Sequence, residues 1–184
     1  TPIIKALSTI KEIKSIINNI NSRKADVSYS SEQYLLYGDD FITEKLGNYK
    51  FKISPDSFFQ TNSNQTKKLY DIIKKEANLK GKEIVYDLYC GTGTIGIYLS
   101  DKAKKIFGFE IISSAIDDAI INASNNNVKN ALFFKGDIKD VLIQNKEVSI
   151  IEKPDISIID PPRAGIHPKA LKNILKLNQN KIIY

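Results

Sequence analysis

Apolar residues in the first part of the chain follow two different spacings. Isoleucine and leucine recur every three or four positions through residues 3–20, with lysines between them, and this periodicity predicts an amphipathic helix. Shorter runs rich in aromatic and β-branched residues, separated by Gly-Asp and Gly-Asn turns, predict strands at 34–37, 41–44 and 49–53. Residues 1–57 therefore predict a small, partial α+β annex.

From residue 58 onward, segments of helical and of strand character alternate. A first helix, apolar from Leu69 to Ala77, is expected to end at Gly81. Thereafter the predicted strands are 83–88, 105–110, 131–135, 155–160 and 181–184, and the predicted helices are 94–101, 114–125, 137–144 and 168–177. Such alternation indicates a parallel sheet with right-handed crossovers. The expected fold class is α/β, with a doubly wound, mostly parallel, Rossmann-like sheet across residues 58–184.

The two ends of the chain suggest a longer protein. The sequence begins with Thr1 rather than Met, and it stops at Tyr184 within its last predicted strand. Domains do not usually end inside a strand that is typical of a sheet interior. We therefore expect a fragment whose sheet is truncated on the C-terminal side.

Composition restricts the chemistry more than it identifies it. The 184 residues include one cysteine and one histidine, so no disulfide framework, iron–sulfur cluster or metal site is expected. No apolar run reaches the length of a membrane span and no signal segment is present, so we expect a soluble, cytoplasmic protein. The net charge of +6 comes almost entirely from lysine in a chain also rich in isoleucine and asparagine. Because an AT-rich genome imposes that bias on any protein, charge alone does not predict a nucleic-acid partner.

A glycine-rich turn follows the predicted strand 83–88. Gly91, Gly93 and Gly96 match the pattern G-x-G-x-x-G between a strand and a helix, where a ligand can touch backbone N–H groups. Glu110 ends the next predicted strand, where an acid is placed to accept both hydroxyls of an adenosine ribose. NAD and S-adenosylmethionine fit these features equally well.

Four acidic residues favour the second of these cofactors. Asp87, Glu110, Asp137 and Asp160 each stand at or just after the end of a predicted strand, and the carboxyl ends of parallel strands meet at one rim of the sheet. Acids there would repel the pyrophosphate of NAD but attract the ammonium and sulfonium of S-adenosylmethionine. Each aspartate alone could be a turn or helix cap; together they favour a cationic cofactor.

Two prolines follow the last of these acids. Asp160-Pro161-Pro162-Arg163 fixes a stiff, extended exit from the strand. An acid or amide before Pro-Pro at this place is common in methyltransferases that act on planar amino groups or bases. The alternative is a rigid strand stop without chemical function.

Four motifs occur in order along the chain: Phe58-Phe59-Gln60-Thr61-Asn62, Asp87-Leu88-Tyr89-Cys90-Gly91-Thr92-Gly93, Gly108-Phe109-Glu110 and Asp160-Pro161-Pro162-Arg163-Ala164-Gly165. Together they resemble the RNA uracil-5-methyltransferases, which form 5-methyluridine in rRNA and tRNA. The resemblance covers roughly residues 30–184 and is closest to the 23S rRNA branch. It implies an S-adenosylmethionine-dependent enzyme whose partner is RNA.

The resemblance also implies which residues contact the cofactor. Gln60 would hydrogen-bond the methionine end, and Tyr89 would pack its ring along the cofactor. Thr94 replaces an asparagine that is common in the family, so it is a secondary candidate. The expected cofactor-binding residues are Gln60, Tyr89, Gly91, Thr94, Glu110, Asp137 and Asp160.

The family's covalent chemistry needs a cysteine thiolate that adds to carbon 6 of uracil, and a glutamate base. The resemblance places that cysteine just beyond Tyr184, so we expect no catalytic residue in this chain, and cofactor binding without methyl transfer. Cys90 is interpreted as a structural residue of the glycine loop, and His167 as a surface or capping residue.

Three alternatives remain at this point. The chain could belong to another base methyltransferase, acting on cytosine carbon 5 or an exocyclic nitrogen. It could be a non-catalytic module that binds cofactor or RNA. A dehydrogenase is disfavoured by the acidic rim.

Overall fold

A computed structural model of the chain describes residues 1–20, 32–144 and 151–184. Its centre is a five-stranded sheet in the order β7-β6-β5-β8-β9, in which all paired strands are parallel. The strands are β5 (Ile84–Leu88), β6 (Lys105–Glu110), β7 (Ala131–Lys135), β8 (Ile156–Ile159) and β9 (Lys181–Ile183). The strand order reverses on the two sides of β5, which is the place where doubly wound sheets bind ligands. The expected doubly wound, Rossmann-like α/β fold is confirmed.

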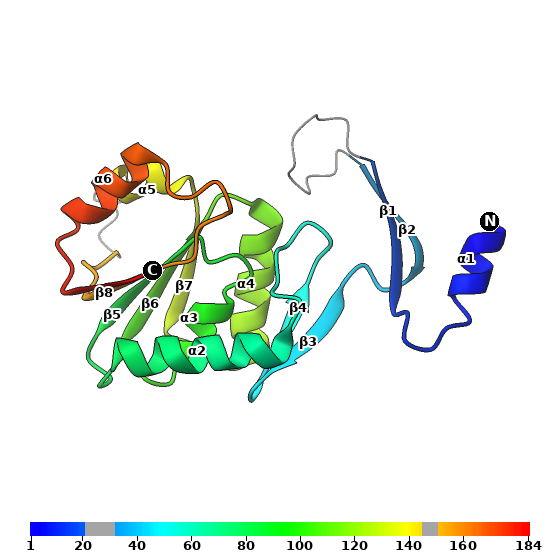
Figure 1. The fold of residues 1–184 in the computed structure, drawn as a ribbon, viewed down its shortest axis with the longest axis horizontal. Coiled ribbons are helices and arrows are strands. Elements are labelled where there is room, and N and C mark those ends of the chain that lie inside the picture. The colour runs from blue at the N-terminus through cyan, green and yellow to red at the C-terminus, as the bar shows by residue number, and fades with distance from the viewer. Residues whose placement is uncertain (21–31, 145–150) are drawn as a thin grey trace.

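Helices cover both faces of the sheet (Figure 1). One apolar cluster joins β5, β6 and β8 to α2 (Ser63–Ala77), α3 (Thr94–Leu99) and α4 (Ser113–Asn125), and a second joins the other face to α5 (Ile138–Gln144) and α6 (Pro168–Lys176). Because successive strand residues point to opposite faces, Val85 belongs to the first cluster and Tyr86 to the second. Helix α2 ends at Asn78, whose left-handed backbone (φ 48°) caps it; the expectation of an end at Gly81 was wrong.

The predicted helix over residues 3–20 is wrong. The structure has a short helix, α1 (Pro2–Leu7), followed by the strand β1 (Ser15–Ile20), which pairs antiparallel with β2 (Glu32–Gly38). The hydroxyls of Ser8 and Thr9 donate to the carbonyls of Lys5 and Ala6, so they compete with continuation of the helix. Downstream, Ile16 and Ile17 are β-branched and favour a strand once a partner strand is present.

The strands expected near 34–37, 41–44 and 49–53 are present as β2, β3 (Ile42–Leu46) and β4 (Tyr49–Ile53). β3 and β4 form a hairpin whose turn contains Gly47 in the left-handed region (φ 60°). This hairpin contributes Leu46 and Phe51 to the first apolar cluster. The elements expected at 1–57 thus divide into a β1–β2 ribbon and a hairpin that shares the core of the sheet domain.

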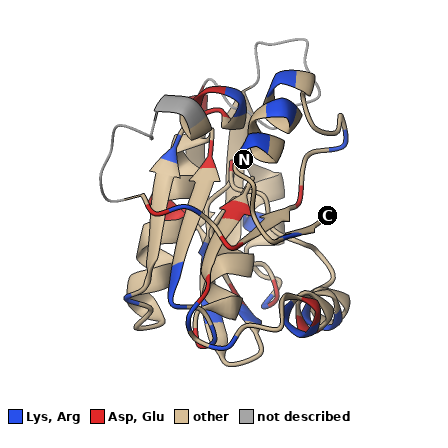
Figure 2. Ribbon diagram, turned by 90° about the vertical axis from the view of Figure 1, so that its left-hand side faces the viewer, with Lys and Arg blue, Asp and Glu red and all other residues tan. Residues whose placement is uncertain are grey.

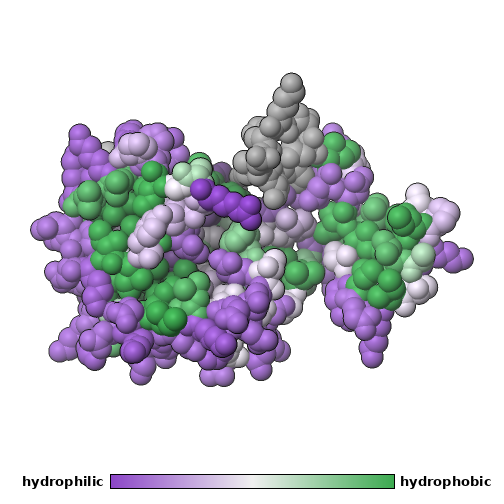
Figure 3. Space-filling model, in the orientation of Figure 1, coloured by the Kyte–Doolittle hydropathy of each residue, from purple (hydrophilic) through white to green (hydrophobic). Residues whose placement is uncertain are grey.

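The β1–β2 ribbon stands apart from the sheet (Figure 1) and exposes apolar side chains (Figure 3). Tyr34 and Leu35, for example, are 49% and 52% exposed. Among the helices of the described residues, none combines the length and the apolar character needed to cross a membrane.

Candidate cofactor site

The loop after β5 is built from left-handed backbone. Tyr89, Gly91 and Gly93 have φ values of 66°, 52° and 77°, and Gly93 N–H donates to the Cys90 carbonyl at 2.8 Å. The left-handed backbone conformation is sterically favourable for glycine but uncommon for a tyrosine. The loop is therefore a tight turn that places the N-terminus of α3 directly behind the end of β5.

Glu110 fixes this loop from the neighbouring strand. Its Oε2 accepts a hydrogen bond from Gly91 N–H at 3.2 Å, and its Oε1 accepts from Ile111 and Ile112 N–H at 2.7 and 3.0 Å. Glu110 is buried, with 9% of its surface exposed. These bonds hold Glu110 beside the glycine loop, at the end of β6, where the sequence predicted an acid. Its Oε2 can still accept a hydrogen bond from a second donor.

Asp87 is the most deeply buried acid of the site. Gly96 N–H donates to its Oδ2 at 2.8 Å, whereas its Oδ1 is buried without a hydrogen-bond partner among the described residues. Burial, together with the charges of Asp160 and Glu110, raises the pKa of Asp87 to about 7. A buried carboxylate oxygen without a partner is costly, and a positive charge near the carboxylate would reduce the cost of keeping it ionised.

The side chains of Gln60 and Asp160 lie close together, although the two residues are far apart in the sequence. Partial desolvation raises the pKa of Asp160, and the nearby Gln60 side chain, as a hydrogen-bond donor, opposes that rise. Asp160 follows β8, so it joins Asp87 and Glu110 at the carboxyl end of the sheet, where acidic residues colour the strand ends in Figure 2. The structure therefore brings together Gln60, Asp87, Glu110 and Asp160.

Asp137 has a different environment. Its two oxygens accept hydrogen bonds from the backbone N–H and the Nζ of Lys139, at 3.1 and 2.7 Å. Burial alone would raise the pKa of Asp137, but these bonds and the Lys139 charge lower it. It caps the start of α5, so the cap interpretation of a single aspartate suits Asp137 best. Tyr89 lies near Asp137. Burial raises the pKa of the Tyr89 hydroxyl, and the charges of Asp137 and Glu110 raise it further.

Thr94 is buried at the start of α3, and its hydroxyl is 2.8 Å from that of Tyr70 on α2. Burial raises the pKa of Tyr70, and the charges of Asp87 and Asp160 act in the same direction. Tyr70 thus lies close to the acids, yet the sequence did not single it out, because it sits within the apolar stripe of α2. Its hydroxyl, on a largely apolar helix face, is the signal that could have drawn attention.

Cys90 and His167 have the structural environments that the sequence suggested. Cys90 is 5% exposed, and burial, followed by the charges of Asp87 and Glu110, raises the pKa of its thiol well above the usual value. His167 is exposed and caps α6, its Nδ1 accepting from Lys169 N–H at 3.1 Å. Within the described residues no group of three or more His, Cys, Asp or Glu side chains could hold a metal ion.

The electrostatics of the site suit a cation. In residues 1–20, 32–144 and 151–184, no ion pair involves Asp87, Glu110 or Asp160. A pyrophosphate beside three acids without a basic partner would be repelled, whereas an ammonium or sulfonium would be attracted.

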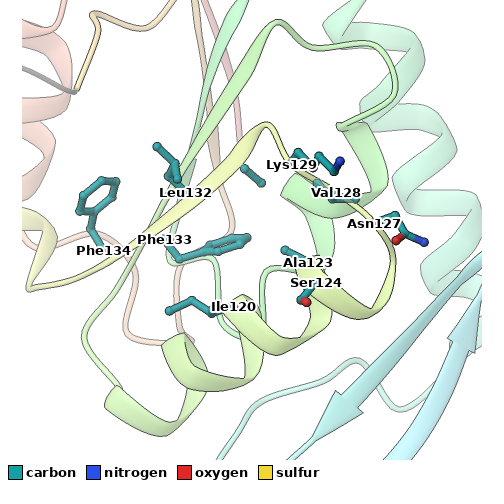
Figure 4. A pocket seen from close by; sticks show the side chains of 10 residues that line it. Ile120, Ala123, Ser124, Asn127, Val128, Lys129, Leu132, Phe133 and Phe134 are labelled. Carbon is teal, nitrogen blue, oxygen red and sulfur yellow. The ribbon is translucent and has the colours of Figure 1, made fainter.

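An apolar groove adjoins the site at the edge of the sheet. It has a volume of about 680 Å³ between α4 and β7. In Figure 4, Phe133 points from β7 toward α4, whereas Phe134 points to the opposite face. The Phe133 ring also fills the space next to Gly93 and Gly108. This ring therefore separates the groove from the glycine loop.

Comparison with known proteins identifies relatives of the whole chain. Residues 7–184 match the family model described as tRNA (uracil-5-)-methyltransferase. An uncharacterized RNA methyltransferase of Chlorobaculum tepidum is 43% identical over 170 residues, which is 92% of this chain and 35% of that protein. A second, from Clostridium tetani, is 44% identical over 184 residues, which is 100% of this chain and 39% of that protein. The chain thus spans less than half the length of these relatives.

A solved structure shares both fold and sequence. The Pyrococcus abyssi tRNA (uracil-54, C5)-methyltransferase in complex with S-adenosyl-L-homocysteine superimposes with a TM-score of 0.73 at 34% identity, covering 95% of this chain and 41% of that one. Trm5b of the same organism is 20% identical with a TM-score of 0.67, and so shares the fold. From the family match, supported by these relatives, the chain belongs to the tRNA (uracil-5-)-methyltransferase family.

Proposed function

We propose that this chain forms the S-adenosylmethionine-binding part of an enzyme that methylates carbon 5 of uracil in RNA. The observation that carries the cofactor assignment is the buried Asp87 carboxylate, whose Oδ1 has no partner among the described residues and which feels the charges of two further acids, Asp160 and Glu110. The bound S-adenosyl-L-homocysteine of the 34% identical neighbour supports it. When bound, S-adenosylmethionine would supply an electrophilic methyl group on its sulfonium.

Each residue has a defined task in this proposal. Asp87 and Asp160 balance the positive charge of the methionine portion, and Gln60 orients it. Glu110, already held by three backbone N–H groups, accepts the ribose hydroxyls, while Gly91 permits close approach of the ligand. Tyr89 packs against the ligand. Thr94 and Asp137 act mainly through the contacts that fix the starts of α3 and α5.

The chain as given binds cofactor without transferring the methyl group. Cys90 is the only cysteine in the sequence, and it is buried with a raised pKa. Uracil addition needs an accessible thiolate, so Cys90 does not serve as the nucleophile. The family's nucleophile is therefore expected outside this sequence.

The RNA target is proposed to be 23S rRNA, because the sequence motifs resemble that branch of the family most closely.

Titration calorimetry tests the cofactor assignment. Both S-adenosylmethionine and S-adenosylhomocysteine are expected to bind, and NADH is not. Asp160→Asn should weaken binding about tenfold, equivalent to about 1.4 kcal/mol, because one acid of the site loses its charge. Asp101→Asn, at an exposed surface residue paired with Lys74, is the matched control and should bind as the unaltered chain does. Absence of heat with both adenosyl ligands from a folded chain would refute the assignment.

The RNA assignment needs the protein that contains this chain. Incubated with S-adenosylmethionine and unmethylated 23S rRNA, it should produce 5-methyluridine, detected by nucleoside mass spectrometry. Parallel reactions with tRNA transcripts separate the two RNA classes. Product in tRNA alone would reject the 23S rRNA target, and methylcytidine or a methylated exocyclic nitrogen would reject the uracil assignment.

A further inference from the structure

Helix α4 contacts the hairpin through three polar side chains on one face. Asp118, Asn122 and Asn126 are spaced four residues apart, which places them above one another on a helix. Asn126 both accepts from Lys50 N–H (2.9 Å) and donates to its carbonyl (2.7 Å). Asn122 makes the same pair of contacts with Lys52, at 2.6 and 3.0 Å. The two amides therefore act on the free edge of β4 as a neighbouring strand would.

Asp118 continues this series beyond the end of β4. It is 1% exposed and accepts from Ser54 N–H, Ser54 Oγ and Ser57 Oγ at 2.8, 2.9 and 2.8 Å. Lys52 Nζ lies 3.5 Å from the same carboxylate. Hydrogen bonds to its oxygens lower the cost of burying an acid. Asp118 is thus the anchor of the turn at residues 54–57.

That turn leads directly into the segment that carries Gln60. Phe59 packs on Phe51 with ring centroids 6.0 Å apart, and the Phe58 carbonyl lies against Gly91, 3.7 Å from where a Cβ on that glycine would stand. The segment therefore crosses the glycine loop on its way to Gln60. Its position depends on how the turn before it is held.

Asn122 also contacts the glycine loop itself. Its Nδ2 donates to the Thr92 carbonyl at 3.2 Å, in addition to the Lys52 carbonyl, and the residue has 0% exposure. One face of α4 thus holds two of the chain segments that reach the candidate cofactor site, although neither Asp118 nor Asn122 belongs to the residues proposed to touch the ligand.

We propose that Asp118 and Asn122 are positioning residues for the cofactor site. They hold the segment before Gln60 and the Thr92 carbonyl on one rigid helix, so the site is ordered before the ligand arrives. Without these anchors, the ligand would have to order residues 54–60 itself, and affinity would fall. This inference rests on the proposed function.

The decisive variant is Asp118→Asn, which keeps the size of the side chain but turns one acceptor into a donor that faces Ser54 and Ser57. We expect the Kd for S-adenosylhomocysteine to rise about tenfold. Asn126→Ala is the matched control, since it removes the contacts to Lys50 without touching the 54–57 turn. It should lower stability while changing the Kd less than twofold. Should Asp118→Asn fail to fold, Ser57→Ala removes a single hydroxyl contact and should raise the Kd about threefold.

A double-mutant cycle with Gln60→Ala distinguishes positioning from general destabilisation. If Asp118 acts through Gln60, Asp118→Asn should cost little more in a chain that already carries Gln60→Ala, because the two effects share one contact. Full additivity of the two losses, or equal losses of affinity in Asp118→Asn and Asn126→Ala, would overturn the inference.

Hydrogen exchange without ligand gives a readout that does not depend on the proposed function. Amides of residues 54–60 should exchange faster in Asp118→Asn than in the unaltered chain, and the Asn126→Ala variant should leave them unchanged. Unaltered exchange in Asp118→Asn would refute the positioning role. Failure of the unaltered chain to bind either adenosyl ligand would instead refute the proposed function.

Discussion

Gly96 N–H donates to Asp87 Oδ2 at 2.8 Å across the glycine loop, while Asp87 Oδ1 is buried without a partner in the part of the chain that the structure describes. The Gly96 bond favours the charged form of the carboxylate, but burial outweighs it and raises the pKa of Asp87 to about 7. The pKa of this acid therefore lies near neutrality rather than near the ordinary value of 3.8 for an aspartate.

Protein stability should depend on pH through this residue. Between pH 4 and pH 7 the folded chain holds a proton on Asp87 that the unfolded chain has lost, so stability falls as pH rises through this window and levels off above it. The loss amounts to roughly 4 kcal/mol at most. Urea unfolding of Asp87→Asn, which keeps the acceptor for Gly96, should show a flatter profile. Asp101→Asn serves as the surface control, and an unchanged slope in Asp87→Asn would contradict the assignment.

Binding of a cationic ligand should release a proton from Asp87. A positive charge beside the carboxylate lowers its pKa, so affinity for S-adenosylmethionine should rise from pH 5 to pH 7. Calorimetry at pH 6.5 in two buffers with different ionisation enthalpies would measure the released proton directly. In Asp87→Asn the buffer dependence should shrink and the affinity should fall. A chain whose binding heat is the same in both buffers would argue against a protonated Asp87.

Gly108 is required by the close packing of Phe133 and Cys90. A Cβ at this position would lie 2.8 Å from Phe133 Cε1 and 2.9 Å from Cys90 Sγ, so Gly108→Ala should cost about 1–3 kcal/mol of stability, measured by thermal unfolding. Adding Phe133→Leu should recover part of that loss, because the ring is the main obstacle. Gly81→Ala is the comparison: no atom lies within 4 Å, and its φ of +83° makes it a test of backbone strain alone. Phe133→Leu should not relieve that second variant.

The single thiol reports on unfolding. Because Cys90 is 5% exposed and its pKa is raised, it should react with an aromatic disulfide reagent only as fast as the chain opens. Saturating S-adenosylhomocysteine should slow the reaction further by stabilising the folded chain. Complete labelling within seconds in native buffer, with unchanged circular dichroism, would show that the thiol is accessible. Since the sequence has one cysteine, no other thiol can confuse the result.

The sheet domain was predictable because its signals are local. Each strand is a short apolar run, and each acid of the site lies in the last two residues of such a run or directly after it, so the parallel arrangement alone brings Asp87, Glu110 and Asp160 to one end. The pairing of β1 with β2 was not predictable in this way. Its isoleucines also satisfy a helical period, and the strand is stabilised by a partner in a separate part of the chain.

The contacts of α4 were missed for a different reason. Asp118, Asn122 and Asn126 bind mainly backbone groups of β4 and the following turn, and a backbone group leaves no mark in the sequence of the strand. The helix predicted at 114–125 stopped one residue short of Asn126. The polar residues at four-residue spacing were visible, but nothing in the sequence named their partner.

Because the Asn126 side chain contacts the backbone of Lys50, the two positions differ in the substitutions that they tolerate. Lys50 offers only its main-chain N–H and carbonyl to Asn126, so any residue that has a backbone N–H can stand at position 50, and proline alone removes the donor. On the helix, few side chains other than asparagine can accept and donate in the required geometry. We therefore expect position 50 to tolerate more substitutions than position 126 does.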